Sequence, residues 1–342
     1  MHDNLPYLSV IVRTYNSAET LTACLAAIKN SSDQDYELLV IDDMSRDQTC
    51  QIAREYTNQV LCLPRHQGMA VARQAGMRAA RGEVIACIDS DAVIEPETLR
   101  KISSFFKSHP EISALTGILS KQHPNRDFFS QYKNLYMHYI FRKLADEITF
   151  LYGSISVVRK NVINLYRPDF DSYGEDTYFG MGLTAQKKRI HFMRDLEVVH
   201  LKKYDFFRFV KNDFFIPFFW AKLFVRYKGW KQFGRKRSGF AHASKGQLSS
   251  VLLAPAIVVL TAMVFMRSLD PMVVGIPAIM WVFFNQRFIN FLTKERGLGF
   301  GSLAVLITFF DNVVMFCGIV SGLLCAVFLG KNRQGGPGNL EA

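Results

Sequence analysis

Short apolar runs and amphipathic segments alternate along the first hundred residues of the chain. The apolar runs have the length of buried strands and occupy residues 8–12, 37–41, 60–63 and 84–88. The segments between them have apolar positions at helical spacing and occupy residues 18–29, 48–56 and 69–81. This alternation predicts an α/β domain with a mostly parallel sheet and helices on both faces. Ligands bind such sheets outside the carboxyl ends of the strands, so the loops after the strands are where a site is expected.

The pattern changes in the second half of the chain. Residues 128–145 have the spacing of an aromatic-rich helix, and residues 149–158 have an extended pattern. From residue 203 to residue 227, aromatic and basic residues recur at near-helical spacing, which is typical of helices in a membrane interface. The chain is therefore predicted to pass from an α/β domain to a membrane-associated part near residue 200.

Three long apolar segments follow, at about residues 249–266, 272–291 and 302–329. Each is as long, or nearly as long, as the ~20 residues that a helix needs to cross a bilayer. This predicts about three transmembrane helices. Asp311 lies within the third segment, where we expect it to be buried against a neighbouring helix. Lys294 and Arg296 place the linker before that segment in the cytoplasm, whereas three crossings would leave Lys331 and Arg333 outside, which counts against that number.

The net positive charge is concentrated in one stretch of the chain. The formal charge is +11, and residues 200–247 hold twelve Lys or Arg against two Asp, so this stretch accounts for ten of the eleven charges. The same stretch holds ten Phe and two Trp and leads directly into the apolar segments. Basic and aromatic residues beside a membrane span favour an anionic membrane surface over nucleic acid as the partner, so no nucleic-acid binding is expected.

The six cysteines form no CxxC pair and no metal-ligand spacing, which is typical of a reducing compartment. No amino-terminal stretch has the basic and apolar regions of a secretory signal. These features predict an integral protein of the cytoplasmic membrane with its α/β domain facing the cytosol. The predicted organisation is an α/β domain at residues 1–200, basic aromatic interface helices at 201–247, transmembrane helices at 248–330 and a flexible tail at 331–342.

Acidic residues follow two of the predicted strands. Asp89 and Asp91, separated by Ser90, come after the fourth strand, where two carboxylates can hold a divalent cation and its bound phosphates. A site made only of oxygen ligands favours Mg²⁺ or Mn²⁺, although Asp and Ser are also common in simple turns. Asp42 and Asp43 follow the second strand, where a carboxylate can accept the imide N–H of a pyrimidine base.

Three other places carry candidate chemistry. Thr14, Tyr15 and Asn16 follow the first strand and offer an aromatic face for stacking on a base. Gly68 begins the third helix and Arg73 lies about one turn into it, an arrangement suited to a pyrophosphate, although an exposed helix charge is the simpler explanation for Arg73. Residues 175–176 are an acidic pair in a loop-like stretch, where a solvated turn is the usual explanation.

The order of these elements is more specific than any one of them. The elements are SVIVRTYN at residues 9–16, VIDDMSRD at 40–47, GMAVAR at 68–73, RGE at 81–83 with DSD at 89–91, and ED at 175–176. In this order and at these distances, the sequence resembles the family-2 inverting glycosyltransferases, which have the Rossmann-like GT-A fold. The resemblance extends from residue 9 to about residue 200.

The resemblance implies a role for each of these positions. Tyr15 would stack on the nucleobase and Asp43 would bind it, with Thr14, Asn16, Asp42, Gly68 and Ser90 also lining the donor site. Asp91 and Asp89 would hold Mg²⁺ or Mn²⁺ on the diphosphate, Arg73 would contact the phosphates, and Asp176, with Glu175, would be the catalytic base. His200 occupies a position where some relatives have a metal ligand, but a histidine at a strand end is an equally good explanation.

The implied reaction is transfer of a sugar from a nucleotide-sugar donor to a hydroxyl of a membrane-associated acceptor, such as a lipid-linked saccharide or glycolipid. The family's habit favours a UDP-sugar. One displacement with a stabilised leaving group and one base would invert the anomeric centre.

Two departures and several alternatives bear on this assignment. Gln74 stands where the family often has Asn, and Gln186 to Arg189 resembles a processive-synthase motif that here lacks its Trp. A polyprenyl-phosphate sugar synthase is the main alternative, although an ionised phosphate acceptor needs no base. A non-catalytic scaffold that binds sugar nucleotides would be expected to lack Asp91 or Asp176. A nucleotidyltransferase and a transporter fit less well, since the first loop is not rich in glycine and the spans lack paired polar helices.

Overall fold

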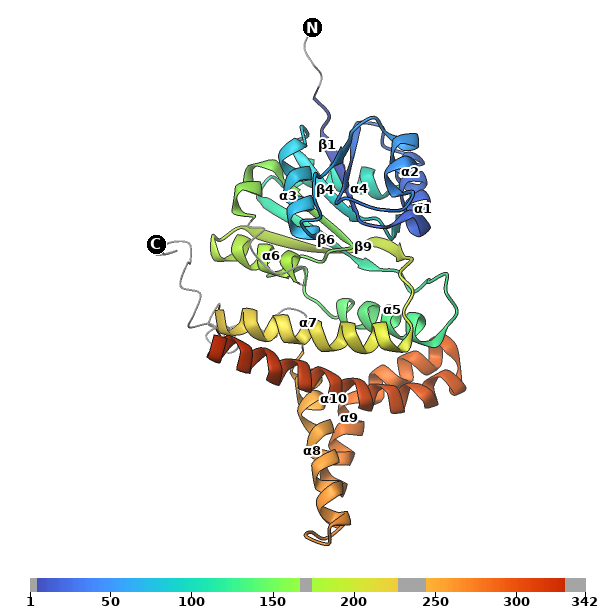
Figure 1. The fold of residues 1–342 in the computed structure, drawn as a ribbon, viewed down its shortest axis with the longest axis vertical. Helices are drawn as coiled ribbons and strands as arrows, with labels where there is room; N and C mark the ends of the chain where they lie inside the picture. Colours follow the sequence, from blue (N-terminus) through green and yellow to red (C-terminus); the bar gives the residue numbers. More distant parts are fainter. Residues whose placement is uncertain (1–4, 167–173, 227–243, 330–342) are drawn as a thin grey trace. The chain divides into compact units, whose positions relative to one another are not determined.

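The computed structural model describes residues 5–166, 174–226 and 244–329. The chain divides into two compact units, Met1–Lys203 and Tyr204–Ala342. Figure 1 traces the chain through the α/β elements of the first unit and then through the four long helices of the second.

The first unit is built on one twisted sheet. Its strands are β1 (Leu8–Thr14), β2 (Tyr36–Asp42), β3 (Val60–Cys62), β4 (Val84–Asp89), β5 (Ala92–Ile94), β6 (Ile112–Leu119), β7 (Glu147–Ile148), β8 (Ile155–Arg159) and β9 (Arg189–His200). In the described residues their order is β3-β2-β1-β4-β8-β6-β9-β5, and β7 pairs with β9. The helices are α1 (Ala18–Lys29), α2 (Thr49–Tyr56), α3 (Met69–Ala79), α4 (Thr98–Ser108), α5 (Phe128–Phe141), the 3₁₀ helix η1 (Lys160–Leu165) and α6 (Glu175–Ala185).

The amino-terminal half of this sheet is parallel, as the sequence predicts. Strands β3, β2, β1 and β4 pair in parallel, and their limits lie within two residues of those predicted from the apolar runs. The other half is mixed, because β8 runs antiparallel to both β4 and β6, and β5 and β7 run antiparallel to β9. The sheet as a whole is therefore mixed rather than mostly parallel.

Side chains alternate between the two faces of the sheet, and each face is covered by its own helices (Figure 1). Val10 and Val12 of β1 belong to the core on the side of α1, α2 and α4. Ile11 of β1 belongs to the core on the side of α3 and α6. Because successive side chains of a strand point to opposite faces, Arg13 lies on the same face as Ile11, toward α3 and α6.

Two predicted elements in the middle of the chain have different limits in the structure. The helix predicted at residues 128–145 is α5, which ends at Phe141. The extended segment predicted at residues 149–158 forms a strand only from Ile155, where β8 enters the sheet between β4 and β6. No glycine or proline directly follows α5, so the sequence gives no clear signal for its end. Before β8, the apolar residues 150–152 extend the pattern of the strand, although Gly153 lies two residues before it.

The second unit contains α7 (Phe206–Arg226), α8 (Lys245–Phe265), α9 (Met272–Arg296) and α10 (Leu298–Leu329). In the described part of the chain, α8, α9 and α10 are long and apolar enough to cross a membrane. Asn285 of α9 donates a hydrogen bond to Ser250 of α8, with Nδ2 and Oγ 3.0 Å apart. Residues 227–243 of the predicted interface segment and the predicted tail at 331–342 lie outside the described residues.

Candidate active site

The carboxyl ends of β1, β2 and β4 bring the predicted loops together. Thr14 at the end of β1 is in register with Asp42 at the end of β2, and Arg13 is in register with Asp89 at the end of β4. Adjacent strands lie about 4.8 Å apart. The residues predicted to bind a donor are therefore gathered at one edge of the sheet, as expected for a parallel α/β arrangement.

Glu175, the first residue of α6, is buried beside the carboxyl ends of these strands, where three side chains hold it. Arg13 Nη1 lies 2.5 Å and Arg73 Nη2 lies 3.0 Å from Glu175 Oε1. The Tyr166 hydroxyl donates a hydrogen bond to Oε2 at 2.8 Å. Burial by itself would raise the pKa of Glu175, but Arg73, Arg13 and Tyr166 outweigh it and hold that pKa below its ordinary value. Glu175 is therefore a buried, ionised and fully engaged carboxylate.

Arg73 lies in the interior and not at the surface of the site. Its side chain has no solvent exposure, and its Nη1 donates a hydrogen bond to Ser156 Oγ of β8 at 3.0 Å. The cause is its position on α3, where Ala70, Arg73 and Met77 form the buried face of the helix. The guanidinium is directed to Glu175, so Arg73 is not the exposed helix charge that the sequence also allowed, and its contact with phosphates stays a prediction.

Asp89 is joined to the same cluster through one of its oxygens. Arg13 Nε and Nη2 donate to Asp89 Oδ1 at 3.0 and 2.7 Å. One guanidinium therefore connects Asp89 of β4 to Glu175 of α6, and it fixes the end of β4 relative to the start of α6. Asp89 Oδ2 is directed elsewhere, toward Gly153.

Gly153 marks the point where Asp89, Asp176 and Arg13 converge. A Cβ atom at Gly153 would lie 3.2 Å from Asp176 Oδ2, 3.4 Å from Arg13 Nη2 and 3.5 Å from Asp89 Oδ2. The Asp176 Oδ1 atom accepts a hydrogen bond from the backbone N–H of Thr177 at 2.7 Å. Burial, together with the nearby charge of Glu175, raises the pKa of Asp176 to about 6. Asp176 is thus a carboxyl group that can exchange a proton near neutral pH.

Asp91 and His200 come together at the pairing of β5 with β9. His200 Nε2 lies 3.4 Å from Asp91 Oδ2, and the backbone N–H of Leu201 donates to the carbonyl of Asp91 at 2.7 Å. Burial would raise the pKa of Asp91, but His200 and Lys202 outweigh it and lower the pKa to about 2. An ionised, partly exposed carboxylate beside an imidazole is a donor set that fits a divalent cation such as Mn²⁺.

The loop after β2 is tied to the start of α3 through Asp43. Its Oδ1 accepts from the N–H of Gln67 and its Oδ2 from the N–H of Gly68, both at 2.8 Å. Gly68 has a φ of 87°, which favours glycine, and it lets the chain turn into α3. The ring of Tyr15, which is 40% exposed, stacks on His66 with centroids 4.1 Å apart. Together these residues form an aromatic surface beside a buried carboxylate.

The remaining predicted donor residues shape the loops. Asp42 Oδ1 accepts from the hydroxyl of Thr14 at 3.1 Å and from that of Ser45 at 2.5 Å. Asn16 Oδ1 accepts from the N–H of Arg46 at 2.8 Å. These hydrogen bonds hold the loop after β1 against the loop after β2.

Ser90 plays a similar part between the first and fourth strands. Its hydroxyl is 2.9 Å from that of Ser17, which lies at the start of α1. The loop that carries Asp89 and Asp91 is thereby fixed beside the loop that carries Tyr15.

Sequence reasoning gave no role to several residues that shape the site. They are Arg13, His66, Gly153, Ser156 and Tyr166. A signal was available only for Arg13, because it is the one charged residue in β1, a strand that is buried along its whole length. The others become part of the site through contacts between distant segments.

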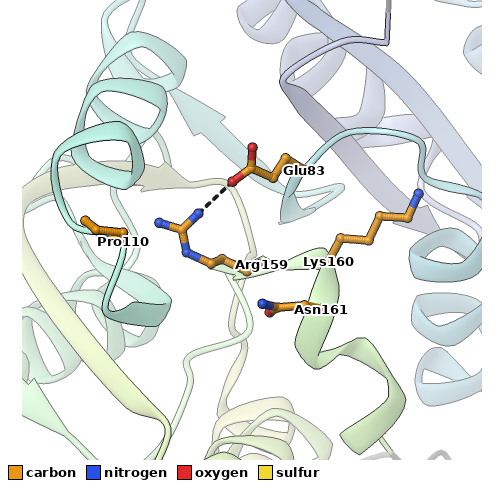
Figure 2. A pocket seen from close by; sticks show the side chains of 5 residues that line it. All are labelled: Glu83, Pro110, Arg159, Lys160 and Asn161. Carbon is orange, nitrogen blue, oxygen red and sulfur yellow. Dashed lines mark hydrogen bonds and ion pairs between the residues drawn. The ribbon is translucent and has the colours of Figure 1, made fainter.

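A separate cavity of about 500 Å³ lies at the opposite edge of the sheet (Figure 2). It is lined by Glu83, Pro110, Arg159, Lys160 and Asn161. Arg159 Nη1 pairs with Glu83 at 2.8 Å, and its Nε and Nη2 donate to backbone carbonyls of Ile112, Phe106 and His109. The Arg159 guanidinium is therefore fully engaged by protein groups. Glu83 directly precedes β4, so the cavity lies at the amino ends of the parallel strands, away from the candidate site.

Comparison with known proteins gives matches over the same part of the chain. Residues 9–166 match the model of the family described as glycosyl transferase family 2. The putative glycosyltransferase EpsH of Bacillus subtilis is 35% identical over 96 residues, which are 27% of this chain and 28% of the relative. The poly(ribitol-phosphate) beta-N-acetylglucosaminyltransferase TarS of Staphylococcus aureus is 27% identical over 208 residues, 55% of this chain and 34% of the relative. The matches thus span about a third of the length of these curated relatives.

Among solved structures, the mannosyltransferase PcManGT of Pyrobaculum calidifontis, in complex with GDP-mannose and Mn²⁺, has a similar fold. The TM-score is 0.55 at 16% identity, covering 95% of this chain and 88% of that one. At this identity the likeness concerns the fold alone, which is of the GT-A type. Residues 9–166 of this chain therefore form a glycosyl transferase family 2 domain.

Proposed function

We propose that this chain transfers a sugar from a nucleotide-sugar donor to a hydroxyl of a membrane-associated acceptor, with inversion at the anomeric carbon. The observation that carries the proposal is the arrangement around Gly153, where Asp176, with a pKa raised to about 6, lies beside Asp89 at the carboxyl edge of the sheet. A base of this kind can accept the proton of an attacking hydroxyl.

The donor nucleotide is proposed to bind on the loops after β1 and β2. The exposed face of Tyr15, supported by His66, would stack on the base. Asp43, which is held in place by the N–H groups of Gln67 and Gly68, would contact the base edge, with Thr14, Asn16, Asp42 and Ser90 shaping the surrounding loops. The expected donor is a UDP-sugar, because the imide N–H of a pyrimidine base can donate a hydrogen bond to a carboxylate.

Asp91 and His200, with Asp89 Oδ2 as a further ligand, would hold a divalent cation, Mg²⁺ or Mn²⁺. The proximity of His200 Nε2 to Asp91 Oδ2 supports this assignment. When bound, such a cation neutralises charge on the departing diphosphate. The pyrophosphate end of the donor would then lie near the DSD segment, one loop away from the base.

The buried charges below the site are proposed to position the reacting groups and not to touch the substrate. Glu175 is saturated by Arg13, Arg73 and Tyr166, so it can neither take a proton from the acceptor nor move freely. Arg73 contributes through Glu175. With Glu175 and Arg73 in positioning roles, Asp176 is the proposed base, and Glu175 fixes the first turn of α6.

The acceptor is proposed to be lipid-linked. The exposed apolar helices α8 and α9 support anchoring in a membrane, and the basic stretch at residues 200–247 favours a cytosolic location for the α/β unit. The name of the relative TarS specifies poly(ribitol-phosphate), and ribitol offers hydroxyl groups to a base such as Asp176. A polyprenyl phosphate would not need that base.

The test uses the full-length protein purified in detergent with Mn²⁺. A panel of nucleotide sugars is screened for hydrolysis and for transfer into extracted native lipids and into polyprenyl phosphate, with Asp91→Ala in parallel. The proposal predicts transfer from one donor into a hydroxyl-bearing lipid, lost in Asp91→Ala and on chelation. Transfer only to polyprenyl phosphate would establish the synthase alternative, and donor binding without turnover would establish a non-catalytic scaffold.

A further inference from the structure

Helices α7 and α10 lie side by side and parallel in the second unit. A Cβ on Gly318 would collide with the carbonyl oxygen of Phe214, and one on Gly322 would collide with that of Phe218. Gly322 lies four residues after Gly318, and its partner Phe218 lies four residues after Phe214, so the two helices run in the same direction. Close backbone approach at glycines spaced four apart is a known way for helices to pack in membranes.

The contact continues toward the amino end of α7. Phe206, eight residues before Phe214, stacks on Phe310, eight residues before Gly318, with ring centroids 5.7 Å apart. The paired region thus covers more than three turns of each helix. Two helices that touch over this length have to share one orientation relative to any membrane that they meet.

Helix α7 has the composition of a surface helix and not of a span. It carries five charged residues distributed along its 21 positions: Arg208, Lys211, Asp213, Lys222 and Arg226. Among the described helices it is not one of the three that are apolar enough to cross. Charged side chains at several depths would be costly in the bilayer core, whereas basic and aromatic residues stabilise a helix at the interface.

The geometry at the start of α10 fits a change of direction. Helix α9 ends at Arg296, Gly297 has a φ of 90°, and α10 begins at Leu298. Within the second unit, Figure 1 shows the tip of the α8–α9 hairpin pointing away from the line of the α7–α10 pair. Moreover, α10 has 32 residues, or about 48 Å at 1.5 Å per residue, which is much longer than the ~30 Å hydrocarbon core.

We propose that α10 lies along the membrane surface beside α7, with its outer face against one leaflet, so that only α8 and α9 cross the bilayer. That outer face is apolar to both ends: the side chains of Leu306, Leu324 and Phe328 are 68%, 52% and 72% exposed. Acyl chains are the partner that such a face fits. The inference rests on the proposed membrane anchoring and does not depend on the proposed reaction, and it replaces the three crossings predicted from the sequence.

The charge distribution agrees with two crossings. Counted by Lys and Arg, Lys245 at the start of α8 and Lys294 and Arg296 at the end of α9 fall on one side, while residues 266–271 at the tip between the helices hold one basic residue, Arg267. Two crossings also return the chain after α10 to the basic side. This removes the conflict that Lys331 and Arg333 create for three crossings.

The first experiment measures depth. Leu306→Trp and Cys317→Trp, both at exposed positions, are made separately in full-length protein whose three native Trp are replaced by Phe, and each is reconstituted into vesicles with lipids brominated at defined depths. The two positions are 11 residues, or about 17 Å, apart along the helix, and in a crossing helix Cys317 would lie near the bilayer centre and Leu306 much closer to the surface. We expect both to be quenched maximally by the same lipid, at a shallow depth. Maxima in lipids brominated at clearly different depths would overturn the proposal.

The second experiment measures sidedness. A reporter that is active only in the cytosol and one that is active only after export are placed after Ala342, and separately within the tip at Ser268. We expect the cytosolic reporter to work at Ala342 and the exported one at Ser268. An active exported reporter at Ala342 would contradict the in-plane placement of α10. Release of the chain by alkaline carbonate would instead refute the anchoring itself, and a lack of sugar transfer would change neither readout.

Discussion

The two adjacent acids at the start of α6 have opposite surroundings. Glu175 is surrounded by Arg73, Arg13 and Tyr166, which keep its pKa below the ordinary value despite burial. Asp176 points toward Gly153, where burial and the charge of Glu175 raise its pKa to about 6. Consecutive residues of a helix point about 100° apart. One turn of helix therefore provides both a fixed structural charge and a group that can exchange a proton.

The pH dependence of transfer should report on Asp176. A base has to be ionised, and its raised pKa means that the ionised fraction grows as pH rises through about 6. We expect kcat/KM to fall about tenfold per pH unit well below pH 6 and to level off above it. The measurement is a pH–rate profile with the thermal midpoint recorded at each pH to exclude unfolding. A profile that is flat across pH 6 would argue against Asp176 as the base.

The buried pair of Arg73 and Glu175 should be important for stability. Arg73→Met removes one of the two cations that balance Glu175 and Asp89, and Arg13 alone then faces both carboxylates, so we expect a loss of about 3–5 kcal/mol in the free energy of unfolding. Arg78→Met on the exposed side of the same helix is the matched control and should change stability by no more than about 0.5 kcal/mol. Denaturant unfolding followed by circular dichroism compares the two. Equal effects would mean that the pair does not hold α3 to α6.

At the scale of elements, the position of α6 decides where Asp176 points. A Cβ at Gly180 would lie 2.5 Å from the backbone N of Leu151 and 2.5 Å from the Cα of Phe150. The helix therefore packs directly on the backbone of residues 150–151, close to Gly153. No side chain can stand between the helix and this segment, so the glycine sets the distance between Asp176 and the end of β4.

Gly180→Ala should therefore displace α6. The added methyl group meets backbone atoms that cannot move aside, so we expect a loss of about 1–3 kcal/mol in stability and a fall in transfer rate. Gly182→Ala in the same helix has open space around its Cβ and should be neutral or stabilising by up to about 1 kcal/mol. Thermal unfolding and transfer assays on both variants make the comparison. An active, stable Gly180→Ala protein would show that the packing is less tight than described.

Local patterns were sufficient to predict the elements of the parallel half of the sheet. The apolar runs that became β1, β2 and β4 are bounded by turn residues, and each is buried on both faces. The antiparallel insertion of β8 between β4 and β6 was not predictable. Its apolar run resembles that of a parallel strand, and its direction is set by pairing with segments about 40 to 70 residues away.

The candidate site was predicted in composition more than in geometry. The acids after the strands were found because strand ends meet at one edge of a sheet. Arg73 was placed on the surface of the site, although Ala70, Arg73 and Met77 have the spacing of a buried helix face, which was a signal present in the sequence. Tyr166 and Gly153 could not be identified, since only the folded chain brings them to Glu175 and Asp176.

At the scale of the whole molecule, the two units have different surfaces. The α/β unit buries its apolar residues in two cores, one on each face of the sheet. In the second unit, large apolar side chains are exposed on α8 and α9: Phe265 is 83%, Met272 84% and Ile276 71% exposed. Exposed apolar surface of this extent needs a nonaqueous partner.

This surface predicts how the protein leaves a membrane. We expect it to remain in the membrane fraction after washing with about 1 M salt, which screens charges over more than a few ångströms, and after alkaline carbonate. Detergent should release it, because only detergent replaces lipid on the apolar helices. Fractionation followed by immunoblotting gives the result. Release by salt alone would mean that the basic stretch at residues 200–247, and not the apolar helices, holds the chain to the membrane.

The most direct test of the central claim compares sugar transfer by the wild-type protein and by Asp176→Asn, at saturating donor. The substitution keeps size and removes the base, so we predict a loss of about 10²–10⁴ in kcat with donor affinity changed less than about twofold. Asp195→Asn, an exposed acid on β9, serves as the control and should transfer at the wild-type rate. If Asp176→Asn transferred sugar to a hydroxyl acceptor as fast as the wild type, the catalytic account given for this site would be wrong.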